Sequence, residues 1–498
     1  MTVVVTGVVI DSRRVNPGNL FVALTGEATD GHRYIPDAIN RGASAVVGTQ
    51  SLEALPVPYV QVKDSRFALP HLAAAFYDFP ARKLVMIGVT GTDGKTTTAN
   101  LIFKILQVAG FQVGMITSVN ALIGDQVLDT GFHVTTPDAP DVQRYLYQMV
   151  STGLTHVILE ATSHGLAQHR VEACEFDMAL VTNITHEHID FHRTHKSYRE
   201  TKGKLFASLV HTQPKSLHPP RGAVLNYDDS SYEYLSDITH VDMLSYGLNA
   251  HADVRGEDVS LKSGGARFST IGRTLSGKEF HMDVESRLIG EYNLYNCLAA
   301  VALTRGVMEL DNQDIKRGIF SFEGVPGRME RIELGQPFSA VVDFAHTPNA
   351  LRNVLKTARH LTSGRVISVF GSAGLRDRLK RRLMAETSAD LADITILTAE
   401  DPRTESLDEI LEEMSSGMNA HRGIEQETYW RIPDRRQAIR FALQLAKPGD
   451  FVIICGKGHE QSMCFGNVEY QWDDRVATHA ALAEMLGIEG PSMPFLPI

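Results

Sequence analysis

Short apolar runs alternate with helical patterns over the first 86 residues of the chain. The runs LFVAL, ASAVVG and YVQV have the length and flanking turns of strands, whereas YIPDAINRG has a helical pattern. This alternation predicts a small α/β domain over residues 1–86.

A strand, a Gly-rich turn and an amphipathic helix then follow in LVMIGVTGTDGKTTTANLIFKILQVAG. The runs THVILEATSH and MALVTNIT predict further buried strands of the same sheet. Over residues 245–288 the pattern becomes period-two and Gly-rich, which indicates an antiparallel flap. The turn-rich segment EGVPGRMERIE is a candidate linker, so this second domain is predicted to span residues 87–325.

The remaining residues, 326–498, repeat a strand and helix alternation. SAVVDFA, RVISVFG, DITILT and DFVIICG predict buried parallel strands separated by helices, as in a doubly wound sheet. The predicted fold class is therefore α/β, with three α/β domains. The central sheet carries an antiparallel flap, and the C-terminal domain is Rossmann-like.

Composition narrows the possible classes of protein. Hydrophobic residues make up 43% of the 498 residues and charged residues 21%, which is typical of a soluble globular protein. The net charge of −11 argues against a dedicated nucleic-acid binder. The cysteines show no CxxC spacing, MTVVVTGVVIDSRR lacks the basic start and long apolar core of a signal peptide, and no window approaches the length of an apolar membrane span. We expect a cytoplasmic monomer with reduced thiols and no membrane insertion.

The stretch GVTGTDGKTTT has the composition of a phosphate-binding loop (P-loop) between a strand and a helix. Glycines let backbone N–H groups curl around phosphate oxygens, a lysine neutralises the β/γ charge, and a threonine hydroxyl reaches Mg²⁺. A tight strand–helix turn with an incidental lysine is the alternative. The motif predicts ATP binding by Gly91, Thr92, Asp93, Gly94, Lys95, Thr96 and Thr97.

Candidate metal ligands follow in two places. Glu160 ends the strand HVILE, where a second acidic ligand of a nucleotide-bound Mg²⁺ would lie. In TNITHEHIDFH, three histidines and an aspartate crowd one loop: His186, His188, Asp190 and His192. Such a cluster could bind zinc. The upstream P-loop favours a role with Mg²⁺ or phosphate, and a solvated polar loop is the third possibility.

The stretch AEDPRTE places Arg403 among acids directly after the predicted strand ITILT. Open α/β sheets bind ligands at the carboxyl ends of their strands. We therefore expect this arginine to contact a ligand in a largely negative pocket.

Taken together, these motifs resemble the Mur ligases, ATP-dependent amide-forming enzymes of peptidoglycan precursor synthesis. The resemblance runs nearly end to end and is greatest to the MurE branch, which adds the third peptide residue to UDP-N-acetylmuramoyl-L-Ala-D-Glu. At the N-terminus, DSRRVNPGNLFVALTGEATDGHRYIPDAINRGASAVV is similar to the uridine-binding domain of that branch. TTPD and SHGLAQHR resemble its substrate-contact segments. The resemblance implies muramoyl-peptide binding by Ser12, Thr135, Thr136, Ser163, Gln168 and Arg170.

The same resemblance assigns catalytic, metal and nucleotide roles. Lys95, Glu160, His188 and Lys202 correspond to catalytic positions, with Mg²⁺ bound by Thr96, Glu160, His188 and Lys202. Lys202, in YRETKGKLF, matches a lysine that the family carbamylates with CO₂, giving N6-carboxylysine. GEYNLYNCLAA, PGRMERI and VDFAHTPNAL resemble ATP-contact segments, which implies roles for Asn296, supported by Asn293, and for Arg328, Asp343 and His346.

AEDPRTE resembles the segment that recognises the incoming amino acid. Diaminopimelate-adding members carry Asp-Asn-Pro-Arg there, so Arg403 is kept while Glu400 and Asp401 replace Asp and Asn. The implied pocket comprises Arg381, Glu400, Asp401, Arg403, Gly456 and Glu460. The arginine favours meso-diaminopimelate, because it can pair with a distal carboxylate. The extra negative charge leaves lysine or ornithine as alternatives, and Asp401 could also mute the arginine by pairing with it.

The implied reaction phosphorylates the D-Glu carboxylate with ATP and lets a free diamino acid attack the acyl phosphate. A folylpolyglutamate-type ligase shares the P-loop but does not explain the N-terminal block. A P-loop GTPase requires an Asn-Lys-x-Asp motif, and the chain contains no Asn-Lys dipeptide. A non-catalytic muramoyl-peptide binding protein does not account for the set Lys95, Glu160, His188 and Lys202.

Overall fold

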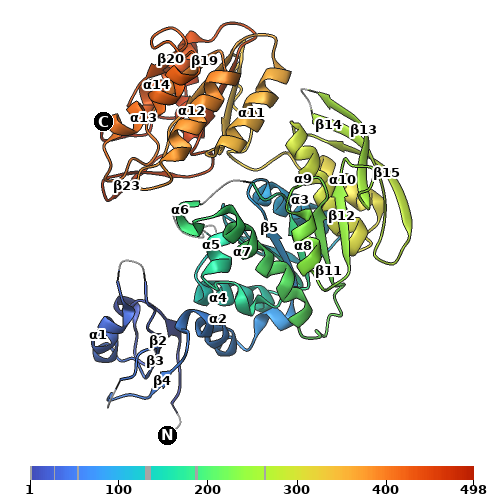
Figure 1. Ribbon diagram of the computed structural model, residues 1–498, viewed down its shortest axis with the longest axis vertical. Coiled ribbons are helices and arrows are strands. Elements are labelled where there is room, and N and C mark those ends of the chain that lie inside the picture. Colours follow the sequence, from blue (N-terminus) through green and yellow to red (C-terminus); the bar gives the residue numbers. More distant parts are fainter. Residues whose placement is uncertain (1–2, 27–28, 53–54, 129–135, 186–188, 263–264) are drawn as a thin grey trace.

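The computed structural model describes residues 3–26, 29–52, 55–128, 136–185, 189–262 and 265–498. Figure 1 shows three lobes along the long axis, in chain order from the N-terminal lobe (blue) to the C-terminal lobe (orange and red). Each lobe is built around its own sheet. The predicted α/β class is therefore confirmed. No helix among the described residues is both long and apolar enough to cross a membrane.

The N-terminal sheet has four parallel strands in the order β1-β2-β3-β4. Its strands are Val8–Val9, Leu20–Val22, Ala45–Gly48 and Tyr59–Gln61. The helices of this lobe are α1 (Ile35–Asn40), between β2 and β3, and α2 (Ser65–Phe76), after β4. α2 packs against α4 (Ala139–Ser151) of the next lobe and so attaches the N-terminal unit to it.

The central sheet has eleven strands in the order β15-β14-β13-β12-β11-β10-β5-β9-β6-β7-β8. The strands are β5 (Val85–Thr90), β6 (Val113–Ile116), β7 (Ala121–Ile123), β8 (Gln126–Leu128), β9 (His156–Glu160), β10 (Met178–Val181), β11 (Gly222–Asn226), β12 (Met243–Gly247), β13 (Val254–Lys262), β14 (Gly265–Arg273) and β15 (Glu279–Ser286). β13, β14 and β15 pair antiparallel, which confirms the predicted flap. The flap is continuous with the central sheet, because β13 pairs parallel with β12.

Helices cover both faces of this sheet. Besides α4 they are α3 (Lys95–Val108), α5 (Ser163–Ala167), α6 (Ile189–His192), α7 (His195–Ser208), α8 (Tyr232–Ile238), α9 (Glu291–Val301) and α10 (Asn312–Ser321). Successive side chains of β5 pack into two different hydrophobic cores, one on each face of the sheet. Val85, Ile87 and Val89 belong to one core and Met86 to the other. Burial on both faces explains why β5 reads as one continuous apolar run in the sequence.

The C-terminal sheet has six strands in the order β16-β17-β21-β18-β19-β20, parallel except for β16. They are β16 (Glu330–Arg331), β17 (Ser339–Asp343), β18 (Val366–Phe370), β19 (Ile394–Leu397), β20 (Tyr429–Arg431) and β21 (Phe451–Cys455). The helices are α11 (Pro348–Leu361), α12 (Leu379–Leu391), α13 (Leu407–Ala420), α14 (Arg435–Leu445) and α15 (Asp474–Leu486), and a hairpin pairs β22 (Ser462–Phe465) with β23 (Val468–Gln471).

A buried ion pair joins the segments that precede β5 and β10, two neighbouring strands in the middle of the central sheet. The Lys215 Nζ donates to the Asp177 Oδ2 at 2.6 Å and to the carbonyls of Glu175 at 2.7 Å and Leu84 at 3.0 Å. Both charged side chains are fully buried. Burial raises the pKa of Asp177 and lowers that of Lys215, so each charge depends on the other.

Replacing Lys215 with methionine should lower the free energy of unfolding by about 3 to 5 kcal/mol, because it leaves a buried carboxylate uncompensated. Denaturant unfolding of the purified variant measures this loss. The matched control is Lys83→Met, which breaks an exposed pair with Asp78 and should change stability by about 1 kcal/mol or less. Equal destabilisation by the two substitutions would contradict the prediction.

Candidate active site

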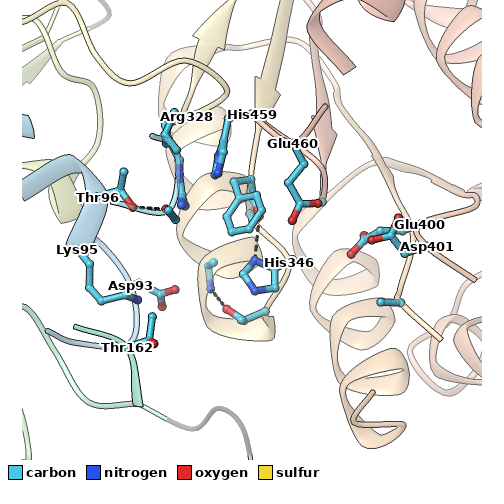
Figure 2. Close-up of a pocket in the computed structure, with 18 of the residues that line it drawn as sticks. Asp93, Lys95, Thr96, Thr162, Arg328, His346, Glu400, Asp401, His459 and Glu460 are labelled. Carbon is cyan, nitrogen blue, oxygen red and sulfur yellow. Dashed lines mark hydrogen bonds between the residues drawn. The ribbon is translucent and has the colours of Figure 1, made fainter. Parts of the chain in front are cut away.

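A cleft of about 1520 Å³ lies between the central and C-terminal lobes. One wall is formed by the loop between β5 and α3 and by the first turn of α3, with Asp93, Lys95 and Thr96 (Figure 2). Glu400 and Asp401 lie on the opposite side, with His346 and Glu460 between them and the loop. The cleft therefore joins the predicted phosphate loop to the predicted amino-acid pocket.

The P-loop depends on two glycines. Gly91 has φ +147°, and a Cβ there would lie 1.9 Å from the Thr182 hydroxyl oxygen. Gly94 has φ +84° at the start of α3, and a Cβ there would meet the Asn296 amide oxygen at 2.4 Å. Both positions combine a left-handed backbone with close packing, so only glycine fits them.

Oxygen ligands gather beside the first turn of α3. The Thr96 hydroxyl donates to Glu160 Oε2 at 3.0 Å and lies 3.0 Å from the Ser118 hydroxyl. Glu160, buried at the end of β9, also accepts the Ser118 backbone N–H at 3.2 Å. Lys95 begins α3, and its Nζ donates to the Thr92 carbonyl at 2.7 Å. Hydroxyl and carboxylate oxygens are the donors that Mg²⁺ prefers.

Two predicted residues, Thr135 and His188, lie outside the described part of the chain, as does His186. His192 is described and buried in α6. Within the described residues, no group of three or more His, Cys, Asp or Glu side chains is arranged to hold a metal ion. The metal set of Thr96, Glu160, His188 and Lys202 therefore stays a prediction.

Lys202 reaches the P-loop from the neighbouring helix α7. Its side chain is buried, and its Nζ donates to the Gly91 carbonyl at 2.5 Å. The same nitrogen lies 4.7 Å from the centre of the Tyr198 ring. The fold thus places this lysine against the loop that the sequence predicts to bind phosphate.

The predicted muramoyl-peptide residues divide into two groups. Thr136, Gln168 and Arg170 line the cleft together. The Arg170 guanidinium donates to the Thr136 carbonyl at 2.6 Å and to the Gln168 side-chain oxygen at 2.8 Å. Ser163 is buried at the start of α5 and Ser12 is buried in the N-terminal lobe, and neither lines this cleft.

A smaller cavity of about 250 Å³ adjoins the P-loop and contains the predicted ATP contacts Asn293, Asn296, Arg328 and Asp343. The Asn296 amide donates to Asn293 Oδ1 at 2.9 Å. Asp343 accepts the backbone N–H groups of Met329 and Ala345, each at 2.7 Å, while burial raises the pKa of its carboxyl.

A polar contact joins the two walls of the cleft. The Asn349 Nδ2 of α11 donates to Asp93 Oδ2 in the P-loop at 2.9 Å. A side chain of the C-terminal lobe therefore contacts the P-loop of the central lobe directly.

At the other end of the cleft lie Glu400, Asp401, Arg403, Gly456 and Glu460. The first three follow β19 and the other two follow β21, so the carboxyl ends of two strands contribute residues to the same end of the cleft. Burial raises the pKa of the Glu400 carboxyl. Within the described residues its Oε2 has no hydrogen-bond partner.

Arg381 is not brought into the cleft. Its guanidinium is fully buried and donates to Glu405 at 2.7 Å and to Glu413 at 3.0 Å. These two carboxylates hold the arginine between α12 and α13, so a contact with the incoming amino acid stays a prediction without support from this geometry.

Lys457 is a fully buried lysine behind the pocket that sequence reasoning missed. Its buried Nζ lies 3.0 Å from both Asp401 carboxylate oxygens and 2.6 Å from Glu460 Oε2. Burial lowers the pKa of Lys457, but the Glu460 and Asp401 carboxylates outweigh it and the net pKa is raised. The only hint in the sequence is a lysine between two glycines in CGKGHE, and a partner 56 positions away cannot be inferred from that.

The environment of the Arg403 guanidinium differs from that of the Lys457 ammonium. Its Nη1 donates to the Gly374 carbonyl at 3.2 Å. Within the described part of the chain, no carboxylate lies within ion-pair distance of this guanidinium. The Asp401 carboxylate beside it is instead held by Lys457 and by the Cys464 backbone N–H at 2.9 Å.

Three Mur ligase family models match the chain. The family's catalytic domain matches residues 4–77, the middle domain residues 89–304 and the glutamate ligase domain residues 327–458. A UDP-N-acetylmuramyl-tripeptide synthetase from Roseiflexus sp. (strain RS-1) is 43% identical over 494 residues, covering 97% of this chain and 95% of the relative.

Two further proteins are similar over nearly the whole chain. A UDP-N-acetylmuramoyl-L-alanyl-D-glutamate--2,6-diaminopimelate ligase from Geobacillus thermodenitrificans (strain NG80-2) is 40% identical, covering 95% of this chain and 94% of the relative. A solved structure of a ligase with the same name is 31% identical, with a TM-score of 0.66, covering 97% of this chain and 95% of that one. The chain therefore belongs to the Mur ligase family, whose members are ATP-dependent ligases.

Proposed function

We propose that this ligase adds a diamino acid to the D-Glu of UDP-N-acetylmuramoyl-L-Ala-D-Glu through an acyl phosphate. The observation that carries the proposal is the cleft itself, which has a P-loop on one side and an arginine-bearing charged pocket on the other. The names of the similar proteins support the same substrates. Residues 1–86 would bind the UDP-muramoyl group, residues 87–325 ATP, and residues 326–498 the incoming amino acid.

The residues beside α3 fit a magnesium–nucleotide complex. Thr96 and Glu160 offer a hydroxyl and a buried carboxylate 3.0 Å apart, and we propose that they hold Mg²⁺ with His188 and a carbamylated Lys202. Bound Mg²⁺ supplies positive charge that offsets the negative charge on the transferring phosphoryl group.

The chain's own groups perform positioning and charge stabilisation. Lys95 lies at the start of α3 and would bind the β- and γ-phosphates, while the loop N–H groups bind their oxygens. Arg170, Gln168 and Thr136 would orient the muramoyl peptide so that its D-Glu carboxylate meets the γ-phosphoryl group. The amine then attacks the acyl phosphate and phosphate leaves, so no nucleophilic side chain is required.

Arg403 favours meso-diaminopimelate as the added residue. Its guanidinium has no carboxylate partner among the described residues and can pair with the distal carboxylate of that amino acid. Asp401 could have neutralised Arg403 by pairing with it, but the Asp401 carboxylate is paired with Lys457 instead. Lysine or ornithine is the second candidate, because the carboxylates of Glu400 and Glu460 would favour a terminal ammonium.

Turnover with a panel of amines tests the proposal. Phosphate release from ATP should require both the UDP-muramoyl dipeptide and a diamino acid, with the product identified by mass. We expect meso-diaminopimelate to be the best amine. Phosphate release without either co-substrate would instead identify a simple nucleotide hydrolase.

An Arg403→Ala substitution should raise the KM for meso-diaminopimelate by about 10- to 100-fold, because a charge-assisted hydrogen-bonding partner is lost. The KM for lysine should change little, since lysine lacks the distal carboxylate. The control is Arg403→Lys, which keeps the charge but not the bidentate fork. Full diaminopimelate selectivity in the alanine variant would rule out this role for Arg403.

A further inference from the structure

Arg435 lies behind the amino-acid pocket without lining it. It is the first residue of α14 and its side chain is fully buried. Its Nη1 donates to the Ala399 carbonyl at 3.0 Å and its Nη2 to the Cys455 carbonyl at 2.7 Å. One guanidinium therefore joins two segments that are 56 positions apart in the chain.

The two carbonyls immediately precede two pocket residues. Ala399 comes before Glu400, after β19, and Cys455 comes before Gly456, at the end of β21. In the sheet, β18 lies between β19 and β21, so these strand ends do not pair with each other. Arg435 supplies the connection that strand pairing cannot provide.

The connection is anchored from the opposite side by a carboxylate. Asp474, the first residue of α15, accepts from Arg435 Nε at 2.8 Å and from Nη2 at 2.7 Å. The Trp472 indole N–H donates to the same carboxylate at 2.8 Å. A planar guanidinium bound by a carboxylate in this forked geometry has little freedom to move, so the carbonyls it binds are held in fixed positions.

The spacing of these strand ends controls the shape of the pocket. A Cβ on Gly456 would lie 2.2 Å from Glu400 Oε2, so the Glu400 carboxyl packs directly over the Gly456 backbone. The positive charge of Arg435 also opposes the rise in the Glu400 pKa that burial causes. A shift of either strand end would change the position and the charge balance of Glu400 together.

We infer that Arg435 is a positioning residue for the incoming amino acid. It sets the distance between Glu400 and Gly456 and thereby the KM for the amine substrate, an inference that rests on the proposed function of this pocket. A purely structural role would lower stability and affect all three substrates alike. The positioning role affects the amine alone.

The test compares Arg435→Lys and Asp474→Asn with Arg365→Lys. Arg365 makes a similar arrangement at the amino ends of β18 and β21, donating to Asp450 at 2.6 Å and to the Leu445 carbonyl at 2.7 Å. The substitutions thus perturb two guanidinium–carboxylate pairs, at opposite ends of the strands of one sheet, of which the Arg365 pair is the more exposed. For each variant, the KM for the amine, ATP and UDP-muramoyl dipeptide, kcat and the melting temperature are measured.

Arg435→Lys should raise the KM for the amine by about tenfold or more, since small displacements of positioning groups have large effects. The KM values for ATP and UDP-muramoyl dipeptide should stay within about twofold. Asp474→Asn should act in the same direction, and Arg365→Lys should lower the melting temperature without changing the KM for the amine.

The outcomes separate the two proposals. If phosphate release by the wild-type enzyme does not depend on the amine, the proposed function is overturned. If the wild-type enzyme requires the amine, but the folded Arg435→Lys and Asp474→Asn variants have an unchanged KM for the amine, the positioning role is overturned. An equal rise in the KM for the amine in Arg365→Lys overturns it as well.

Discussion

Replacing Lys95 with methionine should reduce ATP-dependent turnover by about 10²- to 10³-fold, the usual effect of removing one group that stabilises transition-state charge. Lys95 occupies the first position of α3, where the loop N–H groups and the helix dipole would converge on the phosphates of the proposed ATP. Among the described residues its Nζ donates only to a neutral carbonyl, that of Thr92, so stability should fall by about 1 kcal/mol. The loss is therefore expected in catalysis and not in folding.

Phosphate release with all three substrates measures the effect on turnover, and thermal unfolding measures the effect on stability. Lys104→Met is the matched control, because Lys104 lies on the same helix and its Nζ donates to the Gln107 side-chain oxygen at 3.2 Å, away from the P-loop. It should keep wild-type turnover. If Lys95→Met retained a third or more of the wild-type rate, the γ-phosphoryl group would have to be bound elsewhere.

The buried parallel strands were the most predictable part of the fold. β21 (Phe451–Cys455) and β18 (Val366–Phe370) are apolar at nearly every position, because helices cover both faces of their sheet. Such runs are visible without any knowledge of their partners. The position of the acidic turn directly after β19 followed from the same pattern, and the rule that ligands bind at strand carboxyl ends made it a candidate ligand site.

Non-local pairing could not be predicted. The antiparallel extension through β7 (Ala121–Ile123) and β8 (Gln126–Leu128) consists of strands of three residues, too short for a periodic pattern. The continuity of the flap with the central sheet depends on two residue pairs between β12 and β13. Neither feature has a local sequence pattern of its own.

In the candidate site, too, residues in local motifs could be predicted and residues placed by non-local pairing could not. The P-loop and Glu160 were found because their motif is contiguous or ends a recognisable strand. Lys457 and Arg435 were missed because charged residues are expected on the surface, and each is buried beside a carboxylate more than 35 positions away in the chain. Pairing across the fold, and not local pattern, decides where such residues lie.

Active enzyme should carry one carbamate on Lys202. The neutral amine would add to CO₂ with loss of a proton, which turns a side chain at the P-loop from a cation into a carboxylate-like anion. Lys202 is buried against the Gly91 carbonyl and the Tyr198 ring, close to the loop where Mg²⁺ and ATP are proposed to bind. An ammonium there would repel Mg²⁺, whereas a carbamate would attract it.

Intact-protein mass and ¹³C-bicarbonate labelling with NMR detect the modification directly. Turnover should fall in CO₂-depleted buffer and return when bicarbonate is added. Lys202→Met should lose about 10²- to 10³-fold in turnover and should not respond to bicarbonate, because it lacks the amine. Lys204→Met is the matched control: Lys204 lies two positions further along α7 and is exposed, so this variant should behave as wild type in every measurement.

Two results would contradict the carbamate. One is active wild-type enzyme in which Lys202 is found only as free amine. The other is a Lys202→Met variant with wild-type turnover, because catalysis would then not depend on this lysine or on any modification of it. If Lys202→Met instead lost activity while bicarbonate had no effect on the wild type, the ammonium itself would be the functional form. The Gly91 hydrogen bond would then be its role, as a fixed support beneath the P-loop.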